Sequence, residues 1–188
     1  MEIPILFLLV LAFVVLVPLG YVIAQFNGLV ALRNHIREAW SNVDAELKRR
    51  YELIPNLVAT VKGYAAHERE VLEEVTDLRN RCAANRGGVE SQSADERQLV
   101  SSLGRLVAVA ENYPELRADE NYLQLQEELT NTEDRIQAAR RFYNGNVRDY
   151  RNKCESFPSS LVASGFGFEP ESFFDVDSAV RSAPTVSL

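Results

Sequence analysis

The segment Ile3–Ala24, IPILFLLVLAFVVLVPLGYVIA, decides the fold of this chain. Its 22 residues carry no charge and 19 of them are apolar, the exceptions being Pro4, Pro18 and Gly20. At ~1.5 Å per residue a helix of this length measures about 33 Å, which spans a hydrocarbon core of about 30 Å. The sequence therefore predicts a tail and transmembrane anchor in residues 1–26, with Ile3, Pro18, Gly20 and Ala24 among the anchor residues.

A cleaved signal peptide is the alternative interpretation of this segment. Signal peptides combine a basic start, a shorter apolar run and a cleavage site of small residues. Here only Glu2 is charged ahead of the run, and Val22, Ile23 and Ala24 do not form such a site. A retained anchor is therefore favoured, and a membrane helix also tolerates Pro18 and Gly20.

The distribution of basic residues predicts the orientation of the anchor. No Lys or Arg precedes the apolar segment, whereas the 26 residues after it contain Arg33, Arg37, Lys48, Arg49 and Arg50. Because positive charge is retained in the cytoplasm, we expect a single-pass protein with its N-terminus outside and the rest cytoplasmic. The widely separated Cys82 and Cys154 suit a reducing compartment, although their redox state stays open.

The remaining sequence has the periodicity of long amphipathic helices. Between Tyr122 and Phe157 apolar residues recur at a mean step of 3.5, which predicts one helix of nearly forty residues, capped by Asp119 and ended by Pro158. Shorter stripes lie at residues 29–47, 57–82 and 99–113, and Pro55 suits the first turn of a second helix, with a turn near residues 51–54. The sequence predicts an all-α protein: the transmembrane helix, an antiparallel four-helix bundle with long helices at 27–157, and a mostly irregular tail at 158–188.

The bundle topology predicts which basic residues lie near the bilayer. The first helix leaves the membrane and the second returns, so the Gly87-Gly88 loop and the end near Phe157 are expected close to it, with Pro55 and Pro114 at the distal end. Anionic lipids attract basic side chains at such a surface. The candidates are Arg33, Arg37, Arg79, Arg81, Arg86, Arg148, Arg151 and Lys153. An equally weighted alternative is that they complement helix dipoles at C-terminal ends.

Two further groups of residues have an expected structural role. Arg49, Glu133 and Arg140 lie beside the helix seams and are expected to pair between helices and fix their register. The tail carries four phenylalanines, which either dock on the bundle flank or lie in the membrane interface. The acidic residues around them favour the flank, and residues 177–188 are expected to be mobile. The four are Phe166, Phe168, Phe173 and Phe174.

The sequence predicts no catalytic, metal or cofactor site. Neither His35 nor His67 follows a glutamate by three residues, as metal-binding bundles require, and His67 lacks the second histidine of a zinc-protease helix. The chain contains no G-x-S-x-G nucleophile motif and no phosphate-binding loop. A net charge of −7 and a pI of about 5.0 argue against a nucleic-acid partner.

Several ordered motifs closely resemble the LemA family of bacterial membrane proteins. They include LVALRNHIREAWSNVD at Leu29–Asp44, LKRRYELIPNLV at Leu47–Val58, AENYPEL at Ala110–Leu116, and the run from Glu133 to Asn144. The resemblance covers roughly residues 27–175. It implies an N-terminal membrane helix followed by a cytoplasmic four-helix bundle, without an established enzymatic activity. Some relatives are associated with bacterial internal-membrane formation.

Two hypotheses about function follow. The first is a membrane-anchored, non-enzymatic scaffold in the bacterial inner membrane, whose partners are the bilayer and further copies of the chain; the Gly20-x-x-x-Ala24 pair would let anchors pack closely. The second is a signalling or sensory accessory that binds an unidentified cytoplasmic protein near Pro55 and Pro114.

Overall fold

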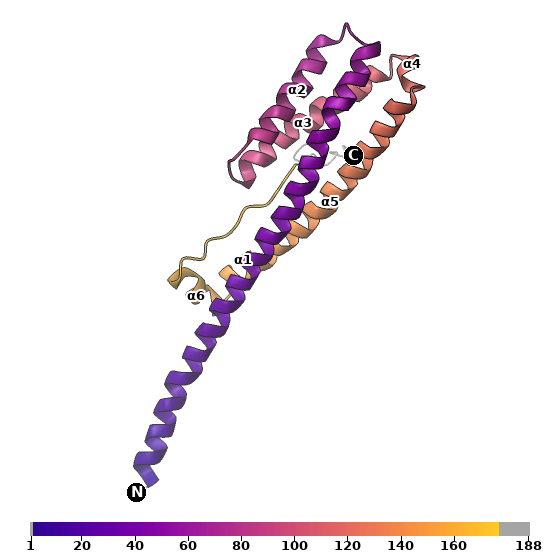
Figure 1. Ribbon diagram of the computed structural model, residues 1–188. Coiled ribbons are helices and arrows are strands. Elements are labelled where there is room, and N and C mark those ends of the chain that lie inside the picture. The colour runs from indigo at the N-terminus through magenta and orange to yellow at the C-terminus, as the bar shows by residue number, and fades with distance from the viewer. Residues whose placement is uncertain (1, 177–188) are drawn as a thin grey trace, which may run out of the picture. The chain divides into compact units, whose positions relative to one another are not determined.

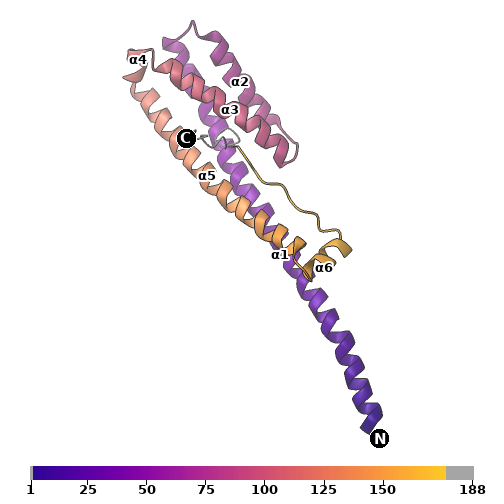
Figure 2. The same cartoon turned by 180° about the vertical axis from the view of Figure 1, so that it is seen from behind.

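The computed structural model describes residues 2–176, with side chains from Phe7 onward. Over this range the chain folds into helices and contains no strand (Figures 1 and 2), which confirms the all-α prediction. The helices are α1 (Glu2–Tyr64), α2 (Arg69–Ala84), α3 (Val89–Ala110), α4 (Pro114–Arg117), α5 (Glu120–Glu155) and α6 (Ser159–Gly165).

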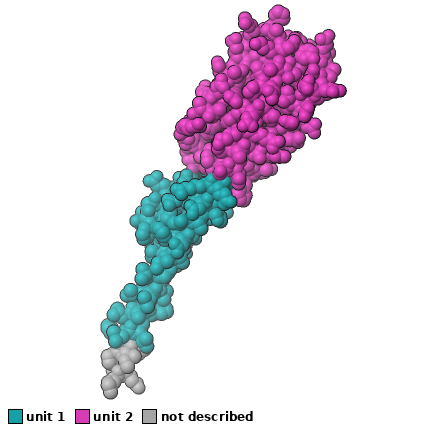
Figure 3. Space-filling model, in the orientation of Figure 1, with its two compact units in different colours: residues 1–39, 145–171 teal, residues 40–144, 172–188 magenta. Residues whose placement is uncertain are grey.

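The chain divides into two compact units, shown in different colours in Figure 3. The first comprises residues 1–39 and 145–171, and the second comprises residues 40–144 and 172–188. α1 continues without a break past residue 26, and both α1 and α5 contribute to each unit. The sequence domains at 1–26, 27–157 and 158–188 stay a prediction.

The first unit contains the apolar segment and a small core where α1, α5 and α6 meet. Leu29, Ile36, Val147 and Tyr150 are buried in it. The Lys153 side chain lies where a Cβ atom on Gly28 would stand, so α5 approaches α1 over a residue without a side chain. Beyond the end of α5, the Ser159 hydroxyl donates to the carbonyls of Lys153 at 2.7 Å and Ser156 at 2.8 Å. These bonds hold the start of α6 against the end of α5.

The second unit contains the C-terminal part of α1, the α2–α3 hairpin, α4 and most of α5. α2 and α3 pack side by side and run in opposite directions (Figures 1 and 2), joined by a loop in which the Gly87 N–H donates to Asn85 Oδ1 at 2.7 Å. Leucine, isoleucine and valine side chains from these helices form the core, among them Val43, Leu47, Ile54, Leu57, Val61, Leu72, Val75, Leu99, Leu103, Leu106 and Ile136.

The predicted turn near residues 51–54 is wrong, because α1 runs through Pro55 to Tyr64. A proline inside a helix lacks the N–H that would bond the carbonyl four residues earlier, here that of Tyr51, at a usual cost of ~3 kcal/mol or more. Arg79 of α2 compensates, since its Nε donates to the Tyr51 carbonyl at 2.8 Å. The chain turns instead at residues 65–68, and the apolar stripe predicted at 57–82 is split between α1 and α2.

The predicted ends of the last long helix are confirmed to within a few residues. α5 spans 36 residues, and Asp119 caps it by accepting the Tyr122 N–H at 2.9 Å. The segment expected to be mostly irregular contains α6. Of its four phenylalanines, Phe168 and Phe174 are buried against the protein, whereas Phe166 and Phe173 are exposed. The mobility predicted for residues 177–188 concerns a segment outside the described residues.

Candidate functional site: the apolar span and a buried polar cluster

The N-terminal part of α1 exposes an unbroken apolar surface. Among the described residues, α1 is the one helix long and apolar enough to cross a membrane. Large contiguous apolar patches on a protein surface mark contact with another apolar phase. Of the predicted anchor residues, Pro18, Gly20 and Ala24 are exposed on this surface, while the Ile3 side chain is outside the described side chains. Within this part of α1, the large side chains that are at least half exposed are Phe7, Leu8, Leu9, Val10, Leu11, Phe13, Val14, Val15, Leu16, Val17, Leu19 and Ile23.

The second unit contains an ion pair that is completely removed from solvent. The Arg50 side chain is 1% exposed and that of Glu96 is 0% exposed, and Arg50 Nη2 is paired with Glu96 Oε2. Arg50 Nη1 also donates to Glu133 Oε2 at 2.8 Å. The guanidinium of α1 thus binds carboxylates from both α3 and α5.

Neutral side chains complete this cluster. The Tyr51 hydroxyl donates to Glu96 Oε1, and Gln92 Nε2 donates to the same oxygen at 2.8 Å and to the Tyr51 hydroxyl at 2.9 Å. Burial, together with the negative charge of Glu96, raises the Tyr51 pKa, so the phenol stays protonated and remains a donor. We name Arg50, Tyr51, Gln92, Glu96 and Glu133 the Arg50 cluster.

The Arg50 cluster has little space for a substrate. The cavity beside it measures about 10 Å³, which is the volume needed for about one water molecule. Nearby, burial and the charge of Glu96 raise the pKa of the Cys82 thiol to about 12, so the sulfur is held as an unreactive thiol. Buried ionic groups of this kind hold helices in one register, because a shifted register leaves a charge unpaired.

The structure places the three predicted pairing residues differently from one another. Glu133 belongs to the Arg50 cluster and Arg140 lines the small cavity beside it, whereas the Arg49 side chain is exposed. The buried guanidinium is that of Arg50, one position further along. The signal was present in the sequence, since the spacing of Val43 and Leu47 continues through residue 50 to Ile54.

The segment 172–176 of the second unit lies against its helices as an extended strap. The Phe174 ring is fully buried, with ring centroids 5.3 Å from Trp40, and Trp40 also contacts Tyr143 at 5.4 Å. Asn144 binds the Phe174 backbone twice, accepting its N–H at 2.9 Å and donating to its carbonyl at 3.0 Å. The Tyr143 hydroxyl donates to the Ser172 carbonyl at 2.9 Å. The strap is thus held by both side-chain packing and backbone recognition.

Three of the predicted lipid-facing basic residues belong to the second unit, where each has protein partners. Arg79 donates to the Tyr51 carbonyl, Arg81 pairs with Asp95 at 2.9 Å, and Arg86 donates to the carbonyls of Ala83 and Asn85. These contacts favour a structural role for the three.

The other five predicted basic residues belong to the first unit, which also contains the apolar span. Arg33 lies 5.1 Å from the centre of the Phe168 ring, and Arg151 is 3.9 Å from Glu155. Lys153 lies over Gly28, while Arg37 and Arg148 are exposed. Their contact with lipid stays a prediction.

Comparison with known proteins gives one family and several relatives. The model of the LemA family matches residues 39–188. Protein LemA of Metamycoplasma hominis is 29% identical over 84% of this chain and 73% of its own length. Magnetosome protein MamQ 2 of Paramagnetospirillum magneticum is 25% identical and Magnetosome protein MamQ of Magnetospirillum gryphiswaldense is 23% identical, each over 80% of this chain. The chain spans 64% of the length of these two magnetosome proteins.

Proposed function

Because the chain belongs to the LemA family, as its resemblance predicted, we propose that it is a membrane-anchored, non-enzymatic helical scaffold that self-associates and organises or shapes the bacterial inner membrane. The observation that carries this proposal is the exposed apolar surface of α1. Burial of apolar surface is worth about 25 cal/mol per Å², so a dozen large exposed side chains strongly favour a lipid environment.

The second unit supplies the rigid part of the proposed scaffold. We infer that the C-terminal part of α1, together with α2, α3 and α5, forms an antiparallel four-helix bundle. The buried ion pair and the Arg79 bond to the Tyr51 carbonyl support this arrangement, because together they join all four helices. The magnetosome proteins among the relatives favour a role in membrane organisation, since the family resemblance includes proteins associated with bacterial internal-membrane formation.

Self-association through the anchor is testable. Gly20 and Ala24 lie four residues apart on α1, both are exposed, and a Cβ atom on Gly20 would meet no atom within 4 Å. Close helix packing in membranes uses such small-residue pairs. We expect the full chain, extracted with its native lipids, to have the mass of an oligomer, and Gly20→Leu to reduce that mass while Val15→Leu leaves it unchanged. A monomer in native lipid would refute self-association.

The proposed orientation places the N-terminus outside and the second unit in the cytoplasm. Cys82 and Cys154 are buried, so a labelling test needs an exposed thiol, and Ser101 on α3 provides the position. In a chain with both native cysteines replaced by alanine, Ser101→Cys should react with a membrane-impermeant maleimide only after the membrane is opened. Labelling in intact spheroplasts would contradict the orientation.

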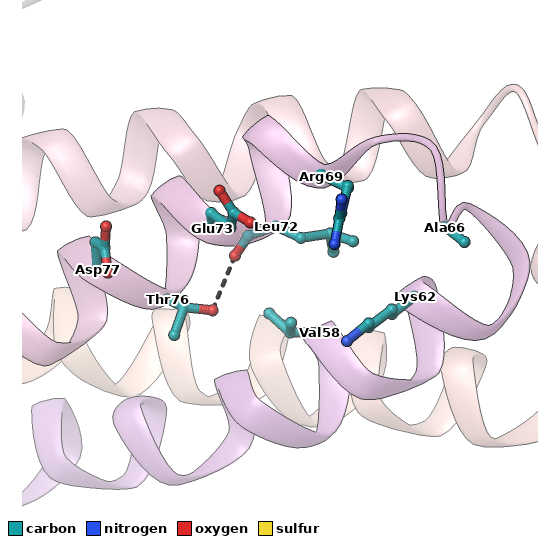
Figure 4. Close-up of a pocket in the computed structure, with 8 residues that line it drawn as sticks. All are labelled: Val58, Lys62, Ala66, Arg69, Leu72, Glu73, Thr76 and Asp77. Carbon is teal, nitrogen blue, oxygen red and sulfur yellow. Dashed lines mark hydrogen bonds between the residues drawn. The ribbon is translucent and has the colours of Figure 1, made fainter.

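A groove beside the α1–α2 turn favours a second candidate function, a signalling or sensory accessory with a cytoplasmic protein partner. The groove measures about 370 Å³ and is drawn in Figure 4. Lys62 and Arg69 line it beside Val58 and Leu72, and Glu73 and Asp77 line it as well, so the groove offers charges of both signs next to apolar side chains. A partner captured by the wild-type chain but not by Lys62→Ser/Arg69→Ser would support this function, and unchanged capture would count against it.

A further inference from the structure

A second apolar surface lies in the first unit, on and around α6. The residues from Ser156 to Phe168 include no Asp, Glu, Lys or Arg. One side of this segment is buried in the unit through Val162, Ala163 and Phe168. Its other side exposes Phe157, Leu161 and Phe166, which are 81%, 65% and 58% accessible to solvent. We name Phe157–Phe168 the α6 segment. Large apolar side chains thus stand on both its protein-facing side and its solvent-facing side.

Ring contacts fix the α6 segment to the end of the apolar span. The Phe26 ring of α1 lies 5.1 Å from Phe166 and 5.4 Å from Phe168, both in edge-to-face geometry. Ile23, 53% exposed, belongs to the apolar span and precedes Phe26 by three residues, or about 4.5 Å along the helix. α6 lies beside α1 in both Figure 1 and Figure 2. The exposed side of α6 thus continues the apolar surface of the span.

We propose that the α6 segment is a second membrane contact, lying in the interfacial layer of the bilayer where α1 leaves it, with Phe157, Leu161 and Phe166 inserted at the boundary between headgroups and acyl chains. The proposal rests on the proposed anchoring by α1. Amphipathic segments bind this layer by burying an apolar face a few ångströms below the headgroups. The exposed Ser164 hydroxyl donates to the Leu161 carbonyl at 3.3 Å, and its oxygen can still accept a hydrogen bond from water in the same layer.

The charge of the surrounding unit indicates which lipids are required. Outside the span, residues 27–39 and 145–171 contain five basic side chains (Arg33, Arg37, Arg148, Arg151, Lys153) and five acidic ones (Glu38, Asp149, Glu155, Glu169, Glu171). The charges cancel, so apolar insertion rather than attraction to anionic lipid drives the contact. We therefore expect it in vesicles of zwitterionic phosphatidylcholine, unaffected by salt.

Fluorescence quenching by brominated lipid tests this proposal on the full chain. In a Trp40→Phe background, Phe166→Trp places a single tryptophan on the exposed side of the α6 segment. The matched control is Phe142→Trp, since Phe142 is another exposed phenylalanine, 61% accessible, but belongs to the second unit. Leu16→Trp reports insertion of the span. Each variant at 166, 157 or 142 is reconstituted in phosphatidylcholine vesicles with or without bromine on the acyl carbons nearest the headgroups. Leu16→Trp is reconstituted with or without bromine near the ends of the acyl chains, because residue 16 lies about 15 Å deeper along α1 than Phe26.

We expect bromine to reduce the emission of Trp at 166 and at 16 but not at 142, and Phe157→Trp to repeat the result at 166. If bromine leaves the emission of Trp at 166 unchanged, as at 142, but quenches Trp at 16, the α6 contact is refuted and the anchor stands. Unquenched emission at 16 would instead refute anchoring itself. An unquenched but blue-shifted emission at 166 would assign this face to a second copy of the chain and also overturn the proposal.

Discussion

Replacing Arg50 by methionine should destabilise the second unit more than any exposed substitution. Methionine retains most of the length of the arginine side chain and removes its charge. Glu96 then stays buried without its cation, keeping only the Tyr51 hydroxyl and the Gln92 amide as donors. Glu133 is affected less, because its side chain is 36% exposed and water can solvate it.

The expected cost follows from the burial of Glu96. Removing one partner of a buried ion pair typically costs 3–5 kcal/mol. Two neutral donors still bind the Glu96 carboxylate, which places the expected loss at the lower end, about 3 kcal/mol in the free energy of unfolding. With a denaturant slope of about 1–3 kcal/mol per molar urea, the midpoint should fall by about 1–3 M.

Trp40 provides the signal for this measurement. It is the one tryptophan of the chain and packs against Tyr143 and Phe174 in the same unit, so unfolding of the unit changes its emission. The full chain is unfolded with urea at constant detergent concentration. The matched control is Arg49→Met, the same change at the neighbouring exposed position, which should alter the free energy of unfolding by no more than about 0.5 kcal/mol.

A double variant separates an unpaired charge from a packing defect. Arg50→Met/Glu96→Met removes both buried charges, and apolar replacement of a buried pair is often neutral or stabilising. It should therefore be more stable than Arg50→Met alone. The reasoning fails if Arg50→Met costs no more than Arg49→Met, or if the double variant is less stable than the single one.

Three further outcomes are expected. Arg79→Met leaves the Tyr51 carbonyl without its donor and should cost about 1–3 kcal/mol in the same urea titration. Asn144→Ala removes both bonds to the Phe174 backbone, so limited proteolysis should cleave the strap faster than in the wild-type chain. The raised pKa of Cys82 stabilises the folded state fully below pH 9.0, the ordinary thiol value, and this contribution is lost between there and about pH 12. Between these pH values the free energy of unfolding should therefore fall less in Cys82→Ala than in the wild-type chain. In the wild-type chain, the Cys82 thiol should react with a disulfide reagent at pH 8 only after unfolding.

The parts of the fold that follow from local patterns were predictable. The apolar run of α1, the acid at the start of α5 and the 3.5-residue stripe along it each depend on neighbours in the sequence. Composition and periodicity report on such features directly. The same patterns gave Glu133 as an interhelical partner, because its position beside the seam is visible in the sequence.

The parts that depend on a distant side chain were not predictable in this way. Pro55 indicates the start of a helix by every local rule, and it lies inside α1 because Arg79 of another helix satisfies the carbonyl that the proline leaves free. Whether Arg49 or Arg50 is the buried residue is decided by continuing the apolar stripe of residues 29–47 past residue 47. The turn predicted at residues 51–54 stopped the stripe before that step. Glu96 is in phase with the buried Leu99 and Leu103 of α3, but this part of the buried face is polar, with Gln92 and Ser93 beside it, so a search for apolar stripes does not find it.

Arg50 and Tyr51 together explain how one short stretch of α1 determines the assembly of the second unit. Both side chains bind the Glu96 carboxylate of α3, and each of the two residues also contacts one further helix. Arg50 binds carboxylates of α3 and α5, while Tyr51 donates its hydroxyl to α3 and accepts Arg79 of α2 on its carbonyl. A shift of any of these helices by one turn would leave a buried charge or a free carbonyl without a partner. Every copy of the chain should therefore present the same surface, which is the property that an assembling membrane scaffold requires.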